Sequence, residues 1–145
     1  QAAGHQVGNH SQSHPAAWFW ALPPGRIREE IERAQGALAG LGAPPLVFRA
    51  VVGMANPFVA PVLERLGLLR VGWSARGYDA TTADPDVVVR RIVRDLRPGA
   101  VILLHEGAAH GRSVEVIEQV LQALAERGYR CVLPDLSARR PPASC

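Results

Sequence analysis

The sequence predicts an α/β protein in which parallel strands pack against outer helices. Three observations favour this class: helical periodicities, short apolar runs, and a glycine between the two at Gly4, Gly42, Gly67 and Gly128. Glycine ends a helix in the left-handed conformation without a Cβ penalty, after which the chain enters a strand. The copies share a pattern and not their residues, so they indicate alternating elements without an internal sequence repeat.

Four helices are predicted in chain order. The first covers residues 26–41, where apolar side chains recur at spacings of three and four residues. Three glutamates in its early turns are expected to be exposed, near the positive end of the helix dipole: Glu29, Glu30 and Glu32. The second opens at Asn56 and Pro57 and runs to about Leu66.

The third and fourth helices have recognisable starts. Asp84 precedes Pro85, and proline is favoured at the first helical position. Ser113 is expected to cap the last long helix, which has a 3.6-residue apolar period: Val114, Ile117, Val120, Leu121 and Leu124.

Strands are predicted over five short runs: residues 5–7, 46–48, 69–73, 100–104 and 129–133. The run 100–104 is apolar throughout, as a strand covered on both faces should be. Residues 74–79 are predicted to be a loop.

Length and composition suit one globular domain, predicted over residues 1–137, followed by a flexible tail over residues 138–145. All 16 basic residues are arginine and the sequence pI is about 9.5. Because these arginines are scattered, we interpret them as solvated helix faces and expect no nucleic-acid partner. No apolar run approaches the roughly 18 residues of a membrane span. Two cysteines make no disulfide framework, so the compartment stays undecided.

The beginning of the chain suggests that its front is missing. The first residue is Gln1, and Ala2, Ala3 and Gly4 have the pattern of a helix end without the helix before it.

The stretch 8–15 holds the strongest candidate site. His10 and His14 lie between a Gly-Asn turn and Pro15. Neutral imidazole is the commonest protein ligand for zinc and similar metals, and catalytic zinc often has two histidines and one carboxylate. A polar loop that happens to hold two histidines is the alternative for such a short motif.

Polar residues also follow the other predicted strands. Arg49 ends one strand, Asp79 lies in the loop after another, and His105 ends the run 100–104. Ligands and catalytic groups of parallel α/β folds gather outside the carboxyl ends of the strands. Convergence of several such residues favours a functional site over incidental polar groups.

These motifs resemble the polysaccharide deacetylases with NodB homology, carbohydrate esterase family 4. Residues 4–15 are similar to the family motif whose two histidines bind the metal. Leu103-Leu104-His105 is similar to another family motif, in which a leucine lines the acetyl pocket and a histidine is the general acid. Trp73 with Asp79 is similar to a further motif. The resemblance implies a distorted (β/α)7-type barrel, which is incomplete here because nothing matches the family's Asp-Asp motif.

The resemblance also implies the roles of individual residues. His10 and His14 bind zinc or another divalent transition metal, whose third ligand, a carboxylate, is not in this chain. His105 is the general acid, oriented by Asp79, and Arg49 positions the catalytic base. The substrate pocket is formed by Leu103, Trp73 and Val52. The backbone N–H near Val52 also helps to hold the oxyanion.

The implied activity is removal of N-acetyl or O-acetyl groups from a polysaccharide, with an amino-sugar polymer as the expected substrate. The sequence departs from the family at residues 50–53, Ala-Val-Val-Gly, where x-Pro-Tyr or x-Pro-Phe is usual after the arginine. A glycan-binding relative without activity is therefore the main alternative, and a nucleic-acid module with salt-dependent binding is a weaker one. Without the carboxylates, the 145 residues alone are expected to have little or no activity. Association with the missing part or with a second copy is left open.

Two further residue groups stay open at this point. Trp18, Phe19 and Trp20 form either a sugar-stacking surface or part of the core. His110, in a glycine-rich loop, is expected to face solvent.

Overall fold

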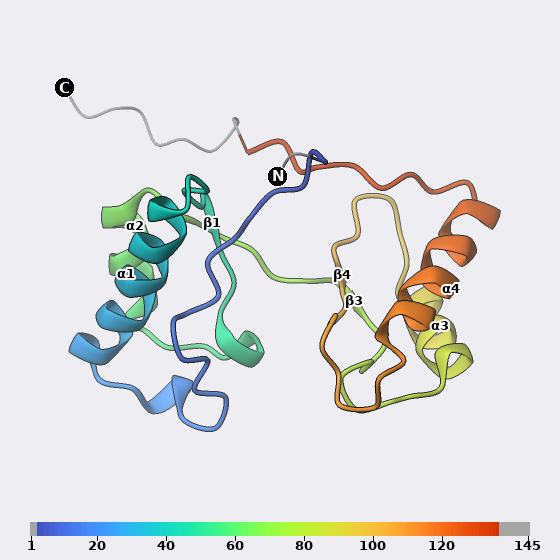
Figure 1. The fold of residues 1–145 in the computed structure, drawn as a ribbon, viewed down its shortest axis with the longest axis horizontal. Helices are drawn as coiled ribbons and strands as arrows, with labels where there is room; N and C mark the ends of the chain where they lie inside the picture. Colours follow the sequence, from blue (N-terminus) through green and yellow to red (C-terminus); the bar gives the residue numbers. More distant parts are fainter. Residues whose placement is uncertain (1–2, 137–145) are drawn as a thin grey trace. The chain divides into compact units, whose positions relative to one another are not determined.

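The structure is a computed structural model that describes residues 3–136, and its contacts divide the chain into two compact units. The first unit runs up to Gly72 and includes residues 133–136, whereas the second comprises Trp73–Val132. The tail predicted over residues 138–145 lies outside the described residues. Each unit has its own pair of α-helices (Figure 1).

The first unit packs two helices against a parallel strand pair. Helices α1 (Pro24–Gly40) and α2 (Val59–Leu66) lie side by side, and β1 (Val47–Phe48) pairs with β2 (Leu69–Arg70). Asn9 extends this pair through one parallel bridge to Phe48. Two 3₁₀ turns complete the unit, η1 (Phe19–Ala21) and η2 (Val51–Gly53).

The core of the first unit contains the predicted inner face of α1. Ile27 and Ile31 are fully buried, together with Phe19 and Phe48, whose ring centroids are 6.4 Å apart. Burial of such large apolar side chains is the main stabilising term of a small domain. The helix predicted over residues 26–41 is confirmed, with a start two residues earlier at Pro24.

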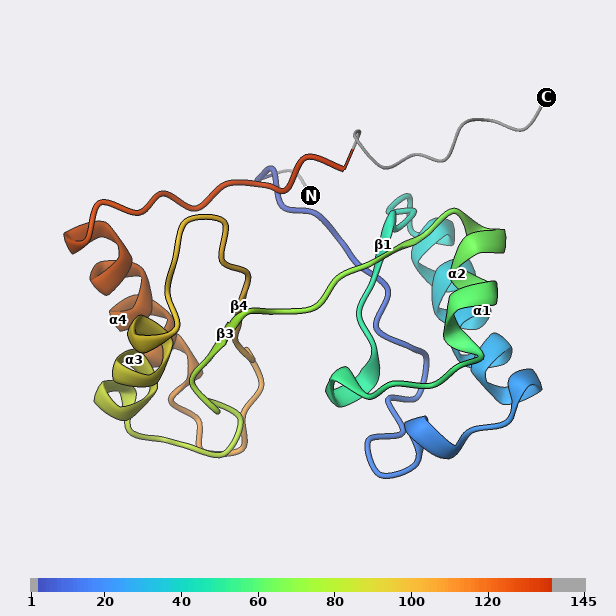
Figure 2. The ribbon, with the colours of Figure 1, turned by 180° about the vertical axis from the view of Figure 1, so that it is seen from behind.

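The second unit has the same plan with different chain segments. Strands β3 (Ala75–Arg76) and β4 (Ile102–Leu103) pair in parallel, and α3 (Pro85–Arg94) and α4 (Ser113–Glu126) run side by side (Figure 2). Buried apolar side chains of both helices meet β3: Ala75, Val88, Ile92, Val116, Val120 and Leu124.

The predicted element ends are partly confirmed. Gly42, Gly67 and Gly128 have positive φ angles of 75°, 64° and 75°, as expected for glycines that end helices. Asp84 caps α3, because its carboxylate accepts hydrogen bonds from the N–H groups of Asp86 (3.0 Å) and Val87 (3.4 Å).

Several strand predictions are wrong. Residues 5–7 and 129–133 form no strand, since no described segment offers them a ladder of backbone partners, and Val132 is 76% exposed. The run 69–73 is strand only at residues 69–70, and the predicted loop contains β3. Strand β4 is only half-covered, with Val101 exposed beside it, because within residues 3–136 it pairs with β3 alone.

Two helix details also differ from expectation. Ser113 is the first residue of α4 and makes no capping bond, because its hydroxyl accepts the Ala108 N–H at 3.2 Å. Val114 and Leu121 of the predicted apolar stripe are exposed, whereas Val116 and Val120 are buried.

The α/β class with parallel strands and outer helices is confirmed. The described strands form two separate pairs and no closed barrel, in agreement with an incomplete barrel. Across residues 3–136, no helix has both the length and the apolar character needed to cross a membrane.

Candidate metal and acid-base site

The first unit holds the two histidines of the predicted metal site. Their ring centroids are 4.8 Å apart, and both side chains are exposed. Nδ1 of His10 lies 2.8 Å from the carbonyl oxygen of Arg49. A carbonyl only accepts, so Nδ1 carries the hydrogen, and Nε2 is the ring's acceptor nitrogen. Fixing one ring nitrogen in this way is how metal-binding histidines are commonly oriented.

A buried carboxylate of α1 holds the backbone between the histidines. Glu30, 5% exposed, accepts hydrogen bonds from the N–H of Gln12 (3.1 Å) and from the N–H (2.8 Å) and hydroxyl (2.7 Å) of Ser13. The expectation that Glu30 is exposed is therefore wrong. Its role could have been found in the sequence, because position 30 is three residues after Ile27 on the inner stripe.

The ionisation of Glu30 is favoured by these donors. Burial pushes its pKa up, but the hydrogen bonds from Ser13 and Gln12 and the charge of Arg26 outweigh burial, so the pKa lies below the ordinary value. Glu30 therefore remains an acceptor for the loop at neutral pH.

Asn9 attaches the start of the loop to the same helix. Its side-chain amide donates to the Ile31 carbonyl (2.9 Å) and the Gln35 amide oxygen (3.0 Å), and its Oδ1 accepts the Ser11 N–H (3.1 Å). Ser11 and His14 adopt left-handed backbone conformations, with φ of 70° and 50°. Such conformations cost free energy in residues other than glycine and persist where surrounding contacts impose them.

Arg49 and Val52 lie just after β1 in the same unit. Arg49 is half-buried, and its Nε has no hydrogen-bond partner among the described residues. Burial lowers the pKa of its guanidinium, which nevertheless stays charged at neutral pH. Val52 has a φ of 52°, a strained conformation for a β-branched residue, and its side chain is 52% exposed.

The second unit joins Asp79 directly to His105. The Asp79 carboxylate accepts the backbone N–H of His105 at 2.5 Å and lies 3.1 Å from its ring Nδ1. Asp79 is 3% exposed, whereas the His105 side chain is 45% exposed. The buried carboxylate thus orients an imidazole whose other nitrogen is accessible.

Two contacts position the Asp79 loop. His110, expected to face solvent, is half-buried instead: its Nε2 donates to the Asp79 carbonyl at 2.6 Å and its Nδ1 accepts the Arg112 N–H at 3.0 Å. Gly77 packs so closely on α3 that an added Cβ would lie 2.3 Å from Val88 Cγ1. The loop therefore needs glycine at this position.

The remaining predicted pocket residues lie on β4, just before His105, and in the segment just before β3. Leu103 is half-buried in β4, in register with Arg76 of β3. Trp73 is half-buried, with the Arg76 guanidinium 5.6 Å from its ring centroid.

The aromatic cluster after the histidines divides between core and surface. Phe19 is fully buried, whereas Trp18 and Trp20 are 67% and 59% exposed. Side chains of a 3₁₀ turn lie about 120° apart, so an inward Phe19 turns both neighbours outward. The amide of buried Asn56 fixes this turn by donating to the carbonyls of Phe19 and Trp20.

The predicted site residues thus fall into two sets. His10, His14, Arg49 and Val52 belong to the first unit, and the others to the second. The donor chemistry of the histidine pair suits a divalent transition metal. Within residues 3–136, however, no group of three or more histidine, cysteine or acidic side chains is placed to hold an ion.

Known polysaccharide deacetylases are similar to this chain in sequence and in fold. The model of the polysaccharide deacetylase family matches residues 1–71. A family 4 carbohydrate esterase from Streptomyces lividans, solved in complex with acetate, is 33% identical with a TM-score of 0.79; the match covers 91% of this chain and 67% of that one. The chain belongs to the polysaccharide deacetylases of carbohydrate esterase family 4.

Two further similar proteins differ in what their names describe. A chitooligosaccharide deacetylase from Azorhizobium caulinodans is 30% identical, over 96% of this chain and 66% of that protein. A family 4 pseudoenzyme from Bacillus anthracis is 25% identical with a TM-score of 0.77, over 89% of this chain and 44% of that one. The chain spans 64–66% of the length of the chitooligosaccharide deacetylases that it matches.

Proposed function

We propose that this family 4 chain takes part in metal-dependent removal of acetyl groups, N-linked or O-linked, from a polysaccharide, most directly an amino-sugar polymer. One observation carries the proposal: two adjacent imidazoles lie on a loop held by a buried carboxylate, with His10 Nδ1 donating to a backbone carbonyl. This arrangement prepares His10 Nε2 to bind a metal. Relatives named as chitooligosaccharide deacetylases support the amino-sugar substrate.

In this proposal His10 and His14 hold zinc or a similar divalent ion. Such an ion supplies Lewis acidity, which polarises a carbonyl and makes water more acidic. Arg49 contributes a cation whose Nε has no partner among the described residues, and it is suited to position a carboxylate base. The strained turn at Val52 presents a backbone N–H for the developing oxyanion.

Hydrolysis of an N-acetyl group also needs a proton donor. The water oxygen adds to the carbonyl carbon, the C–N bond breaks, and the nitrogen leaves as an amine once it is protonated. His105 donates that proton, because Asp79 fixes its Nδ1 and leaves its other nitrogen accessible. Leu103 and Trp73 line the acetyl pocket.

The described residues lack a third metal ligand and a carboxylate base beside the histidines. A missing general base removes about 10² to 10⁴ of rate. We therefore expect little or no turnover by the 145 residues alone, and faster turnover by a protein that includes any residues encoded before Gln1.

The test uses a protein that includes any residues encoded before Gln1, and it measures acetate released from chitooligosaccharides and from acetylated peptidoglycan during a zinc titration. Acetate release that follows zinc and disappears in His10→Ala and His105→Ala supports the proposal. The exposed His5, changed to alanine, is the matched control and should retain zinc binding. Zinc-independent release, or release unaffected by both variants, would refute the proposal.

A glycan-binding relative without activity is the second candidate. It is favoured by residues 50–53, which depart from the family motif, and weakly by the Bacillus anthracis pseudoenzyme among the structural neighbours. Oligosaccharide binding without acetate release, in a protein that includes an upstream Asp-Asp motif, would favour this alternative.

A further inference from the structure

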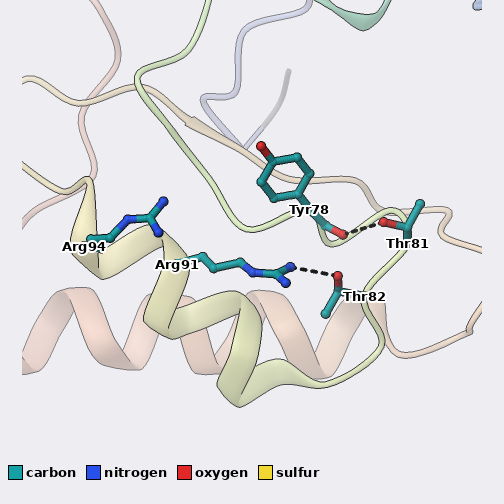
Figure 3. A pocket seen from close by; sticks show the side chains of 5 residues that line it. All are labelled: Tyr78, Thr81, Thr82, Arg91 and Arg94. Carbon is teal, nitrogen blue, oxygen red and sulfur yellow. Dashed lines mark hydrogen bonds between the residues drawn. The ribbon is translucent and has the colours of Figure 1, made fainter.

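A pocket in the second unit is built around Tyr78 and is separate from the Asp79–His105 pair. It has a volume of about 450 Å³ and is lined by five side chains: Tyr78, Thr81, Thr82, Arg91 and Arg94 (Figure 3). Pockets of roughly 300–1,000 Å³ are the usual size for small-molecule ligands. None of the lining side chains is acidic.

Guanidinium groups surround the Tyr78 ring. The Cζ of Arg76 lies 4.0 Å from the ring centroid and the Cζ of Arg91 lies 5.6 Å from it. Arg94 lines the same pocket from the last turn of α3. Three cations thus lie close to one aromatic side chain.

Only one of these cations has a carboxylate partner. Arg94 pairs with Asp95 at 3.0 Å, whereas no carboxylate of residues 3–136 lies within 4.0 Å of Arg76 or Arg91. The Nε of Arg76 is buried and has no hydrogen-bond partner among the described residues. The cluster therefore has surplus positive charge, which an anion would compensate.

The pocket is also preorganised. Arg91 donates to the Gly77 carbonyl at 3.2 Å and to the Thr82 hydroxyl at 3.0 Å, so its guanidinium is fixed over the loop (Figure 3). The Thr81 hydroxyl donates to the Tyr78 carbonyl at 3.2 Å. Tyr78 has a φ of 62°, a left-handed conformation, and it is about half exposed, whereas its neighbour Asp79 is buried.

We propose that this pocket binds a sugar residue that carries a carboxylate, with the pyranose ring against Tyr78 and the carboxylate on Arg91, the lining arginine that has no carboxylate partner among residues 3–136. Guanidinium groups match the planar geometry of a carboxylate, and an aromatic ring offers an apolar face to a sugar. The threonine hydroxyls suit the sugar hydroxyls. The inference rests on the proposed function for the choice of a sugar, and it narrows the substrate class to acidic glycans.

The experiment uses the full 145-residue chain and a matched pair of probes, glucuronate and glucose, which differ only at one carbon of the sugar. Binding is measured by titration calorimetry, or by NMR of the Tyr78 ring, at low and high salt. Glucuronate should bind saturably and more weakly at high salt, and glucose should not bind. Arg91→Gln should weaken glucuronate binding about tenfold, the loss of one charge-assisted hydrogen bond. Arg94→Gln should weaken it less, because Arg94 already pairs with Asp95.

Arg90→Gln is the control, since Arg90 is on the same helix and does not line the pocket. If Arg91→Gln loosens the loop, Arg91→Lys serves as a second variant that retains the charge. Thermal unfolding verifies the fold of each variant. Equal binding of glucose, or unchanged binding in both pocket variants, would overturn the inference. Inorganic phosphate that binds as tightly as glucuronate, with the same dependence on Arg91, would overturn the sugar assignment.

This outcome is independent of the acetate assay. Zinc-dependent acetate release without glucuronate binding would refute only the acidic-glycan inference. Glucuronate binding without acetate release by a protein that includes any residues encoded before Gln1 would refute only the deacetylase proposal.

Discussion

The histidine pair of the first unit and the Asp79–His105 pair of the second are held in different ways. His10 and His14 lie on a loop whose backbone is fixed by Glu30, a carboxylate from a helix that follows in the sequence. His105 is bound directly by the carboxylate of Asp79. The two histidines of the first unit thus depend on an indirect support, with buried polar groups and left-handed residues. His105 depends on one carboxylate, which contacts both its backbone N–H and its ring.

This difference makes Glu30 the most sensitive position of the loop. Glu30→Gln replaces one acceptor oxygen by a donor NH₂ group, so a loop N–H or hydroxyl is left unpaired. We expect the free energy of unfolding to fall by about 1–3 kcal/mol. Zinc affinity should fall about tenfold, as is typical when a group that orients a ligand is lost. Chemical denaturation and zinc competition with a chromophoric chelator measure the two effects.

Glu29→Gln is the control for that variant, because Glu29 pairs with exposed Arg26 and Arg33 on the same helix. Exposed pairs contribute less than about 1 kcal/mol.

Acid dependence of the free energy of unfolding provides a second check on Glu30. The pKa of Glu30 is lowered in the folded state, so its stabilisation is present above the ordinary value of 4.5 and is lost as the pH falls through the folded pKa. Glu30→Gln should flatten the loss of stability below pH 4.5; equal slopes would show that Glu30 does not support the loop.

Asp79→Asn tests the direct contact between Asp79 and His105. Its effects on stability and on zinc affinity should be smaller than those of Glu30→Gln. The buried amide offers a weaker acceptor to the His105 N–H and to its ring, at an expected cost of about 1–2 kcal/mol in the free energy of unfolding. The ¹⁵N chemical shifts of the His105 ring should show loss of the Nδ1–H tautomer. Zinc affinity should stay within about twofold, since independent sites rarely couple. A large fall in zinc affinity would mean that the two regions are not independent.

The smallest expected effect concerns the exposed tryptophans beside the histidine loop. If Trp18 contributes to glycan binding, Trp18→Ala should weaken binding of a chitooligosaccharide several-fold without changing stability, because its side chain is 67% exposed. Titration calorimetry with chitopentaose measures this change. Leu41→Ala, a similarly exposed apolar residue at 82%, is the control. Unchanged binding in Trp18→Ala would leave the histidine loop without an aromatic sugar surface at this position.

The sequence by itself determined the helices, the glycines that end them and the candidate site residues. Helical periodicity and cap residues are local signals, so Ile27, Ile31, Asp84 and Gly67 behave as predicted. The motifs that resemble the deacetylases also indicate the correct family by themselves.

Only the tertiary structure decided which polar groups are buried and which strands are paired. Glu30 is a buried support and Ser113 is no cap, because their partners, Ser13 and Ala108, are brought to them by the fold. Residues 129–133 have the composition of a strand, yet a strand exists only where another backbone completes its hydrogen bonds. Periodicity describes one segment at a time, whereas hydrogen bonding and burial depend on what the rest of the chain places beside it.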